Sequence, residues 1–264
     1  MSGPLAEMTN RVVRRLAPSA RAARVASLVR NQCDMLIGYH LAPAHHADVN
    51  GEEWLVRRVA PHTRRFLDVG ANVGDWSLLM ASAAPDAKGL AVEPGEEAGA
   101  RLRAVLPPAV RLVEALAGAE EGETAFFEAP DASTHSSAVA SHAPAARRRT
   151  VRATTVDALL AAEGWDRLDV LKIDTEGFDA RVLAGAREAL GAQRIGVVQF
   201  EYNRPWREAG STLAGALQLL GDAGYATYVL RASGLEAYRY DDYGEFFRYA
   251  NFVGVAPWAR AWFT

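Results

Sequence analysis

The residues with the clearest chemical meaning form one short segment, residues 66–77, which reads Phe-Leu-Asp-Val-Gly-Ala-Asn-Val-Gly-Asp-Trp-Ser. Its apolar start is typical of a buried parallel strand, and Gly70 and Gly74 allow a tight turn whose backbone can approach a ligand closely. A second apolar run, residues 90–92, ends at Glu93, whose carboxylate can accept hydrogen bonds from both hydroxyl groups of a ribose. The two segments together predict a pocket for a cofactor that contains a nucleoside.

The spacing of the glycines distinguishes between cofactors. Dinucleotide sites usually carry G-x-G-x-x-G, whereas three residues separate Gly70 from Gly74 here, so the loop lacks the full set of glycines that seats a pyrophosphate. Asp68 precedes the turn, and its carboxylate would repel a phosphate but attract an ammonium group. S-adenosylmethionine has an ammonium group at one end and a ribose at the other, and we expect this cofactor. A nicotinamide-dependent oxidoreductase and a non-catalytic nucleoside-binding protein are the alternatives.

A second group of ionisable residues lies in residues 168–179, which read Leu-Asp-Val-Leu-Lys-Ile-Asp-Thr-Glu-Gly-Phe-Asp. Lys172 is inside an apolar strand, and a buried ammonium group is costly unless an acidic partner neutralises it. Asp174 and Glu176 follow at the carboxyl end of the strand, the edge at which open α/β sheets bind ligands. The next apolar run ends at Glu201, which we expect at the same edge. The alternative is that Asp174 or Thr175 only caps the following helix.

Several of these segments resemble the FkbM family of S-adenosylmethionine-dependent methyltransferases. The resemblance extends over about residues 50–252 and depends on five segments, residues 68–74, 155–157, 171–177, 182–186 and 200–201. It implies a class I, Rossmann-like methyltransferase. It also implies a position for each cofactor-binding residue: Glu93 on the ribose, Glu114 and Ala115 near the adenine, and Asp68, Gly70, Asn72 and Gly74 around the methionine part.

The resemblance also implies a reaction, because many members of the family methylate hydroxyl groups of natural products or sugars. We expect an O-methyltransferase with a small-molecule acceptor, a sugar or a polyketide-like hydroxyl compound, with N-methylation as the alternative. Transfer to an alcohol requires in-line alignment and a positioned base. Trp206 is expected to wall the acceptor site. A divalent metal ion on Asp174 and Glu201 is possible, but no metal site is predicted. The candidates for the catalytic group are Asp174, Glu176, Lys172, Glu201 and His135.

Composition excludes some classes of protein. The formal net charge of −3 and the sequence pI of about 6.1 argue against a nucleic-acid-coating domain, which is normally basic. Cys33 is the only cysteine, so no disulfide within the chain and no thiolate zinc cluster can form. No apolar stretch reaches the roughly 18 residues that span a bilayer. We therefore expect a cytoplasmic protein with neither nucleic acid nor membrane as a partner.

The elements that must position these residues alternate between short apolar runs and amphipathic stretches from residue 64 onward. This pattern predicts an α/β fold with a doubly wound, mostly parallel seven-stranded sheet that ends in an antiparallel pair. A hairpin is expected around residues 124–128 and 149–153. The predicted strands are residues 65–69, 88–92, 110–113, 168–173, 195–201, 225–230 and 249–255. The predicted helices are residues 74–83, 96–106, 155–162, 178–190 and 211–223.

Residues 1–50 are expected to form a helical extension ahead of a methyltransferase domain at residues 51–264. Apolar residues recur there at helical spacing, at Val25, Leu28, Val29, Leu36 and Ile37. We expect this stripe to pack on the core or on a partner subunit, so that the protein forms a homo-oligomer through the N-terminal helices or the aromatic C-terminus. Docking of the arginine-rich face on a membrane surface is the alternative.

Overall fold

The computed structural model describes residues 12–41, 50–129 and 146–264, and these fall into two compact units, residues 1–42 and 43–264. In the first unit, residues 12–16 are helical and the long helix α2 spans Ala20–Leu41. No helix in the described ranges is long and apolar enough to cross a membrane. All other described helices and strands belong to the second unit.

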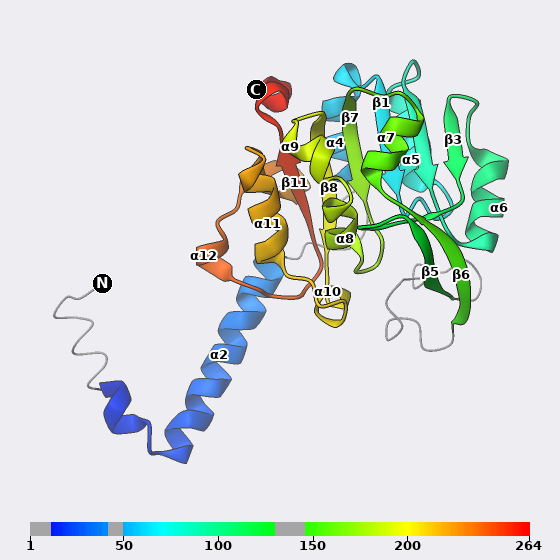
Figure 1. Cartoon of the computed structure of the whole chain (residues 1–264). Helices are drawn as coiled ribbons and strands as arrows, with labels where there is room; N and C mark the ends of the chain where they lie inside the picture. Colours follow the sequence, from blue (N-terminus) through cyan, green and yellow to red (C-terminus); the bar gives the residue numbers. More distant parts are fainter. Residues whose placement is uncertain (1–11, 42–49, 130–145) are drawn as a thin grey trace. The chain divides into compact units, whose positions relative to one another are not determined.

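An eight-stranded sheet forms the centre of the second unit (Figure 1). The strand order is β10-β9-β11-β8-β7-β1-β2-β3, parallel from β8 to β3 and antiparallel where β11 pairs with β8 and β9 and where β10 pairs with β9. The sequence predicted this α/β class and its mostly parallel sheet correctly. The strands are β1 (Arg65–Val69), β2 (Lys88–Val92), β3 (Val110–Val113), β7 (Leu168–Ile173), β8 (Ile195–Tyr202), β9 (Ala226–Arg231), β10 (Gly234–Ala237) and β11 (Ala250–Val255).

Helices cover both faces of this sheet, because each face presents apolar side chains that must be buried. The first face packs against α4 (Glu52–Val59), the 3₁₀ helix η1 (Ala60–His62), α5 (Asp75–Ala83), α6 (Glu96–Val105) and the 3₁₀ helix η4 (Pro257–Phe263). The helices α7 (Val156–Ala162), α8 (Asp179–Ala184), α9 (Arg187–Gly191) and α11 (Leu213–Asp222) pack together as a second group. Two short helices, α10 (Pro205–Glu208) and α12 (Tyr240–Tyr243), lie in connections.

A second, three-stranded sheet has the order β4-β6-β5 and follows the strand β3. Its strands are β4 (Leu116–Ala117), β5 (Gly122–Glu128) and β6 (Arg147–Thr154). The hairpin expected from the sequence is the antiparallel pair β5–β6. Glu128, at the end of β5, links this hairpin to the N-terminus of α6. Its Oε1 accepts hydrogen bonds from the backbone N–H groups of Glu96 and Glu97, at 2.5 and 3.4 Å. A carboxylate at a helix N-terminus is favourable because it meets otherwise unpaired N–H groups.

The fold differs from the sequence prediction in two places. An eighth strand, β10, extends the sheet, and β11 inserts between β8 and β9, so the last strand in the chain lies inside the sheet. The helix predicted over residues 178–190 is two helices, α8 and α9. The break has a physical cause: the carboxylate of Asp157 accepts hydrogen bonds from the N–H groups of Glu188 and Ala189, both at 2.9 Å, and so caps a new helix start.

The carboxyl ends of the central strands meet at one edge, where the loops after β1 and β7 touch. Gly70 has φ of 81°, and a Cβ atom built on it would lie 1.8 Å from the carbonyl oxygen of Asp174. The N–H of Asp174 in turn donates to the carbonyl of Val69 at 2.9 Å. Only a residue without a side chain fits between these two loops, so the glycine sets how closely they approach.

We predict that Gly70→Ala lowers the free energy of unfolding by about 3 kcal/mol or more, because the methyl group adds both left-handed backbone strain and a steric overlap. The free energy is measured by urea denaturation. Gly191→Ala is the matched control: Gly191 has no atom within 4 Å of a built Cβ and ends a helix. There we expect a change within about 1 kcal/mol. Equal effects of the two substitutions would show that the close contact between the loops does not contribute to the free energy of unfolding.

Candidate functional site

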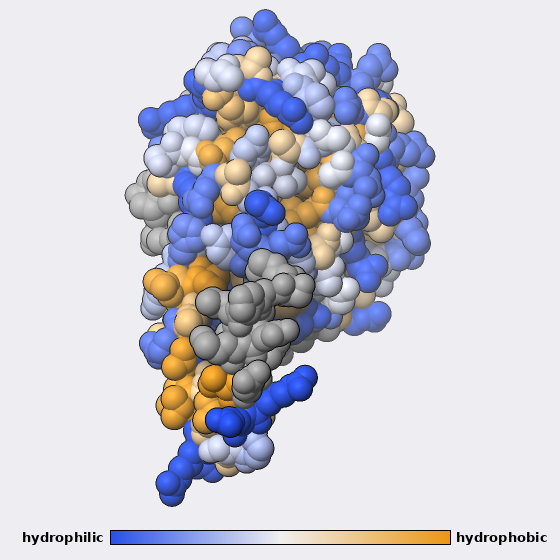
Figure 2. Space-filling view, turned by 90° about the vertical axis from the view of Figure 1, so that its left-hand side faces the viewer, coloured by the Kyte–Doolittle hydropathy of each residue, from blue (hydrophilic) through white to orange (hydrophobic). Residues whose placement is uncertain are grey.

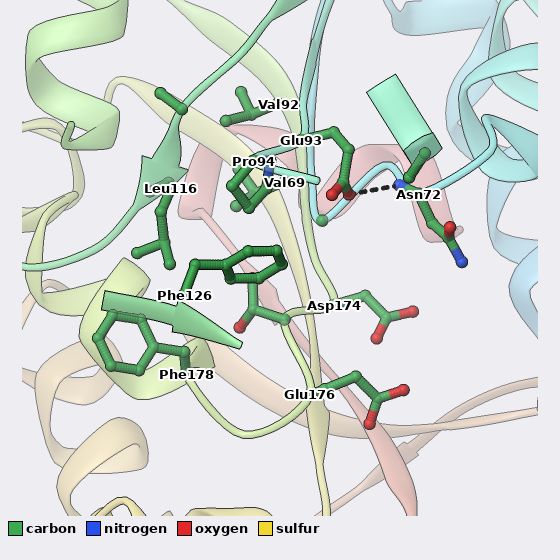
Figure 3. Close-up of a pocket in the computed structure, with 15 residues that line it drawn as sticks. Val69, Asn72, Val92, Glu93, Pro94, Leu116, Phe126, Asp174, Glu176 and Phe178 are labelled. Carbon is green, nitrogen blue, oxygen red and sulfur yellow. Dashed lines mark hydrogen bonds between the residues drawn. The ribbon is translucent and has the colours of Figure 1, made fainter. Parts of the chain in front are cut away.

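A pocket opens at this edge, between the ends of β1, β2 and β7 and the three-stranded sheet (Figure 3). Apolar side chains form one side of it, and the carboxylates of Asp174 and Glu176 lie on the other. Gly70, Asn72 and Glu93 lie at the tips of the first two strands. The lining residues are Val69, Gly70, Asn72, Val92, Glu93, Pro94, Ala98, Ala115, Leu116, Ala117, Phe126, Asp174, Thr175, Glu176 and Phe178.

The carboxylate of Glu93 is held in place by two backbone groups. The N–H of Asn72 donates to its Oε2 at 2.9 Å, and the N–H of Gly95 donates to its Oε1 at 2.7 Å. The side chain is only 6% exposed. Burial raises the pKa of Glu93 to about 7, although the two backbone hydrogen bonds act in the opposite direction. Each oxygen keeps lone pairs for hydroxyl donors from a ligand.

The apolar side of the pocket can accept a flat ring. Phe126 comes from β5, Phe178 precedes α8, and Leu116 comes from β4, so three separate elements contribute to it. Ala115 is fully buried beside them and leaves room where a larger side chain would fill the pocket. Aromatic and aliphatic groups in this arrangement bind planar rings by stacking and burial of apolar area.

Lys172 is buried among carboxylates. Its Nζ donates a 3.0 Å hydrogen bond to Oδ2 of Asp174 and lies 4.0 Å from Oδ1 of Asp68. Burial alone would lower the pKa of Lys172, but the charges of Asp174, Asp68 and Glu52 outweigh burial and raise it above its ordinary value. The ammonium group therefore stays charged and fixes the orientation of the Asp174 carboxylate at the edge of the pocket.

Asp68 lies behind the pocket rather than in its wall. It is fully buried, and Oγ of Ser77 donates to its Oδ2 at 2.7 Å, while Oδ1 has no hydrogen-bond partner among the described residues. Burial raises the pKa of Asp68, with the charge of Lys172 and the hydrogen bond from Ser77 opposing it. In this arrangement Asp68 balances the charge of Lys172.

Glu201, at the end of β8, adds a further carboxylate to this edge. Burial raises the pKa of Glu201 well above its ordinary value, and the charges of Asp174, Glu176 and Asp179 raise it further. Nδ2 of Asn203 donates to its Oε1. Among the described residues, no three His, Cys, Asp or Glu side chains are arranged to hold a metal ion.

Asp179 was not singled out from the sequence, although it is fully buried between two site loops. It accepts hydrogen bonds from Oγ1 of Thr175 at 2.9 Å and from the N–H of Glu201 at 3.2 Å. Burial, with the charge of Asp174, raises the pKa of Asp179 to about 7. This carboxyl group links the loop after β7 to the end of β8, so it fixes the distance between the acidic residues of the site.

The remaining residues named from the sequence lie elsewhere. Gly74 caps α5 with φ of 102° and packs against Leu102, outside the pocket lining. Glu114 is largely exposed and forms a 2.6 Å ion pair with Arg103 on α6. His135 lies outside the described residues. The prediction that Trp206 walls the acceptor site is wrong, because its side chain is fully buried and its Nε1 donates to the carbonyl of Glu201.

The sequence did not identify Phe126 and Phe178 as pocket residues. Phe178 immediately follows the acidic loop, and this position was a usable signal. No sequence signal identified Phe126, because no local pattern predicts that the hairpin folds back beside β2 and α6. Two described residues assigned to the catalytic group, Lys172 and Glu201, are not among those that line the pocket.

Comparison with protein-family models supports the interpretation of this chain as a methyltransferase. Residues 68–227 match the model of the methyltransferase FkbM domain. No curated protein matches the chain. A solved methyltransferase FkbM from Methylobacillus flagellatus is 13% identical, with a TM-score of 0.47 over 72% of this chain, and the chain covers only 43% of its length.

Two further solved structures show similar levels of likeness. The N-terminal domain of EvdMO1, solved in the presence of SAH and D-fucose, is 15% identical with a TM-score of 0.43, over 81% of this chain and 84% of that one. An O-methyltransferase from Bacillus cereus in complex with SAH is 13% identical with a TM-score of 0.40, over 77% and 78%. The FkbM model itself covers more than half of the chain, and this protein therefore belongs to the FkbM methyltransferase family.

Proposed function

We propose that this methyltransferase transfers the methyl group of S-adenosylmethionine to a hydroxyl group of a small, uncharged, hydroxyl-rich acceptor such as a sugar-containing natural product. The observation that carries the proposal is the arrangement of Glu93 and Asp174. One carboxylate suits the ribose of the cofactor, and the other lies across the same pocket at the place where an acceptor would meet the methyl group.

The cofactor half of the proposal rests on three features of the pocket. Glu93 offers two fixed oxygens to the hydroxyl groups of a ribose, and Phe126 with Phe178 offers an apolar slot for the adenine. The loop from Gly70 to Asn72 brings backbone close to the ligand without the glycine pattern of a pyrophosphate site. A carboxylate-rich edge also suits the ammonium and sulfonium charges of this cofactor.

The acceptor half rests on the charges around Asp174. The charges of Asp174 and Glu176 both raise the pKa of Glu201. The buried ammonium group of Lys172 already forms an ion pair with Asp174. An anionic acceptor would be repelled there. Hydroxyl groups, in contrast, donate hydrogen bonds to carboxylates, so a polyol is favoured.

Transfer to an alcohol needs a base at the moment when the new bond forms, and a positioned base contributes about 10²–10⁴-fold to the rate. Asp174 and Glu201 are the candidates. Glu201 has the raised pKa that makes a carboxylate a better proton acceptor, and Asp174 lines the pocket itself. We assign the base to Asp174 because it faces the cofactor pocket, and we assign Lys172 the task of orienting it.

The first test is calorimetric titration of the full chain with S-adenosylhomocysteine and, separately, with NADH. We expect one molecule of S-adenosylhomocysteine to bind per chain and NADH not to bind. Transfer of a labelled methyl group from S-adenosylmethionine is then screened against neutral glycosides, polyketide alcohols, amines and the phosphorylated forms of the same glycosides. Binding of NADH alone would overturn the proposal, and methylation of amines alone would replace the O-methyltransferase with an N-methyltransferase.

Glu93→Gln should weaken binding of S-adenosylhomocysteine about 10- to 100-fold, because a hydrogen bond to a charged group contributes about 1.5–3 kcal/mol. Glu114→Gln is the matched control, since Glu114 carries the same side chain but is exposed and paired with Arg103. The dissociation constant of both variants is measured by calorimetry. An unchanged constant for Glu93→Gln would remove this residue from the ribose site, whereas a loss in Glu114→Gln would place Glu114 near the adenine after all.

Binding should also depend on pH through Glu93. Its pKa is raised to about 7, so the side chain becomes protonated as the pH falls below that value and one of its oxygens no longer accepts hydrogen bonds freely. We expect the affinity for S-adenosylhomocysteine to fall about three- to fivefold between pH 7 and pH 6, because the deprotonated fraction of a group with this pKa falls from about one half to about one tenth. Glu93→Gln should lack this part of the pH dependence. Identical profiles for the two proteins would assign the titration to another group.

Asp174→Asn should lower the turnover number about 10²–10⁴-fold, the usual contribution of a general base, while leaving the affinity for S-adenosylhomocysteine within about threefold. Turnover is followed as methyl transfer to the acceptor identified in the screen, and affinity is measured by calorimetry. If affinity and turnover decrease together, Asp174 belongs to the cofactor site and Glu201 becomes the base.

A further inference from the structure

The first unit exposes a set of large apolar side chains that the FkbM fold does not explain. On α2, Val25, Leu28, Val29 and Leu36 are 57–73% exposed, and Tyr39 is 79% exposed. Steps of three, four and seven residues place them along one side of the helix. The helical residues 12–16 add three more, Val12, Val13 and Leu16. In the lower part of Figure 2, apolar side chains of this unit gather on one side and polar ones lie beside them.

The same segment is basic in an otherwise acidic chain. Residues 1–41 carry six arginines against Glu7 and Asp34, a net charge of +4, whereas the whole chain has a net charge of −3, so the remaining residues carry −7. Arg21, Arg24 and Arg30 lie on α2 itself and are exposed. A surface that binds this helix must therefore combine an apolar region, which covers the stripe, with negative charge that neutralises the arginines.

The described surface of this protein does not offer that combination. Outside the first unit, Val105 is the only large hydrophobic side chain that the structure shows as exposed. The acidic second unit of another copy could attract the arginines but would leave the apolar stripe uncovered. Pairing of α2 with the same helix of another copy would cover the stripe but would bring two segments of charge +4 together.

We propose that α2 lies on the surface of a lipid bilayer that contains anionic headgroups. Its valine and leucine side chains would enter the boundary between headgroups and acyl chains. Arg21 and Arg24, which helical spacing places in and beside the stripe, would extend their charged ends to the phosphates, and Arg30 would face the surface potential from the outer side. Such a helix lies in the plane of the surface and does not cross it, in agreement with the absence of a membrane-spanning helix in the described ranges. The acidic second unit would be repelled from the same surface and would stay in the aqueous phase.

The proposal is tested by flotation of the full chain with vesicles of phosphatidylcholine alone and of phosphatidylcholine with about one third phosphatidylglycerol. We expect the protein to float with the anionic vesicles, with a bound fraction that falls at high salt because the attraction is partly electrostatic. Binding to neutral vesicles should be weaker by about 10²-fold, since each arginine near an anionic surface contributes about 1 kcal/mol.

Two variants separate the apolar and the charged contributions. Leu28→Ser with Leu36→Ser should abolish flotation with either vesicle. Replacing all three arginines of α2 by glutamine should remove about 10²-fold of the affinity for anionic vesicles only. In the matched control, the exposed Arg148, Arg187 and Arg260 of the second unit are replaced by glutamine in the same way. This control variant should float with anionic vesicles as the unaltered protein does. The melting temperature of each variant shows whether the second unit remains folded.

Three results would overturn the proposal. The first is a protein that stays in solution with both kinds of vesicle. The second is an equal loss of flotation in the control, which would make the attraction a property of the total charge. The third is the absence of vesicle binding together with a dimer, seen by light scattering, that is lost in the Leu28→Ser, Leu36→Ser variant. This result would show that the stripe packs against a second copy of the chain.

Discussion

The ammonium group of Lys172, buried between Asp68 and Asp174, is the interaction on which the rest of the site depends. Asp68, Lys172 and Gln199 are register neighbours on β1, β7 and β8, so they share one face of the sheet. Nε2 of Gln199 donates to Glu52 on α4 at 2.7 Å, and the row thus reaches the covering helix. A shift of one residue between these strands would turn the ammonium group to the opposite face and leave the carboxylates without it. The same register places the loops after β1 and β7 side by side.

The local pattern of the sequence was sufficient for most of the fold. Seven strands of the main sheet lie within a residue or so of the expected bounds, because buried strands appear in the sequence as short apolar runs between polar or amphipathic stretches. Two features required long-range information. The place of β11 depends on pairing with β8 and β9, and the break between α8 and α9 depends on a cap from Asp157, which lies about 30 residues earlier.

The site was predictable where chemistry and strand ends coincide. Gly70, Asn72, Glu93, Ala115 and Asp174 were named from the sequence, and the structure brings them to one pocket. The residues that lie elsewhere share a cause, because a sequence shows which residues follow a strand but not where their side chains turn. Glu114 is next to a pocket residue yet forms an ion pair with Arg103 on α6. The hairpin that supplies Phe126 is positioned by its own Glu128, whose partner on α6 lies about 30 residues earlier in the chain.

The interior position of β11 has a consequence for how the chain folds. The strands β1, β2, β3, β7 and β8 can pair as soon as they are synthesised, but β9 and β10 have no edge to join until β11 has been made and has paired with β8. On the ribosome the cofactor-binding half of the sheet can therefore assemble first. The edge of β8 then stays unpaired until β11, about 50 residues later in the chain, has been synthesised. Open strand edges of this kind favour pairing with other chains, so the interval before β11 emerges is the period of greatest risk of aggregation.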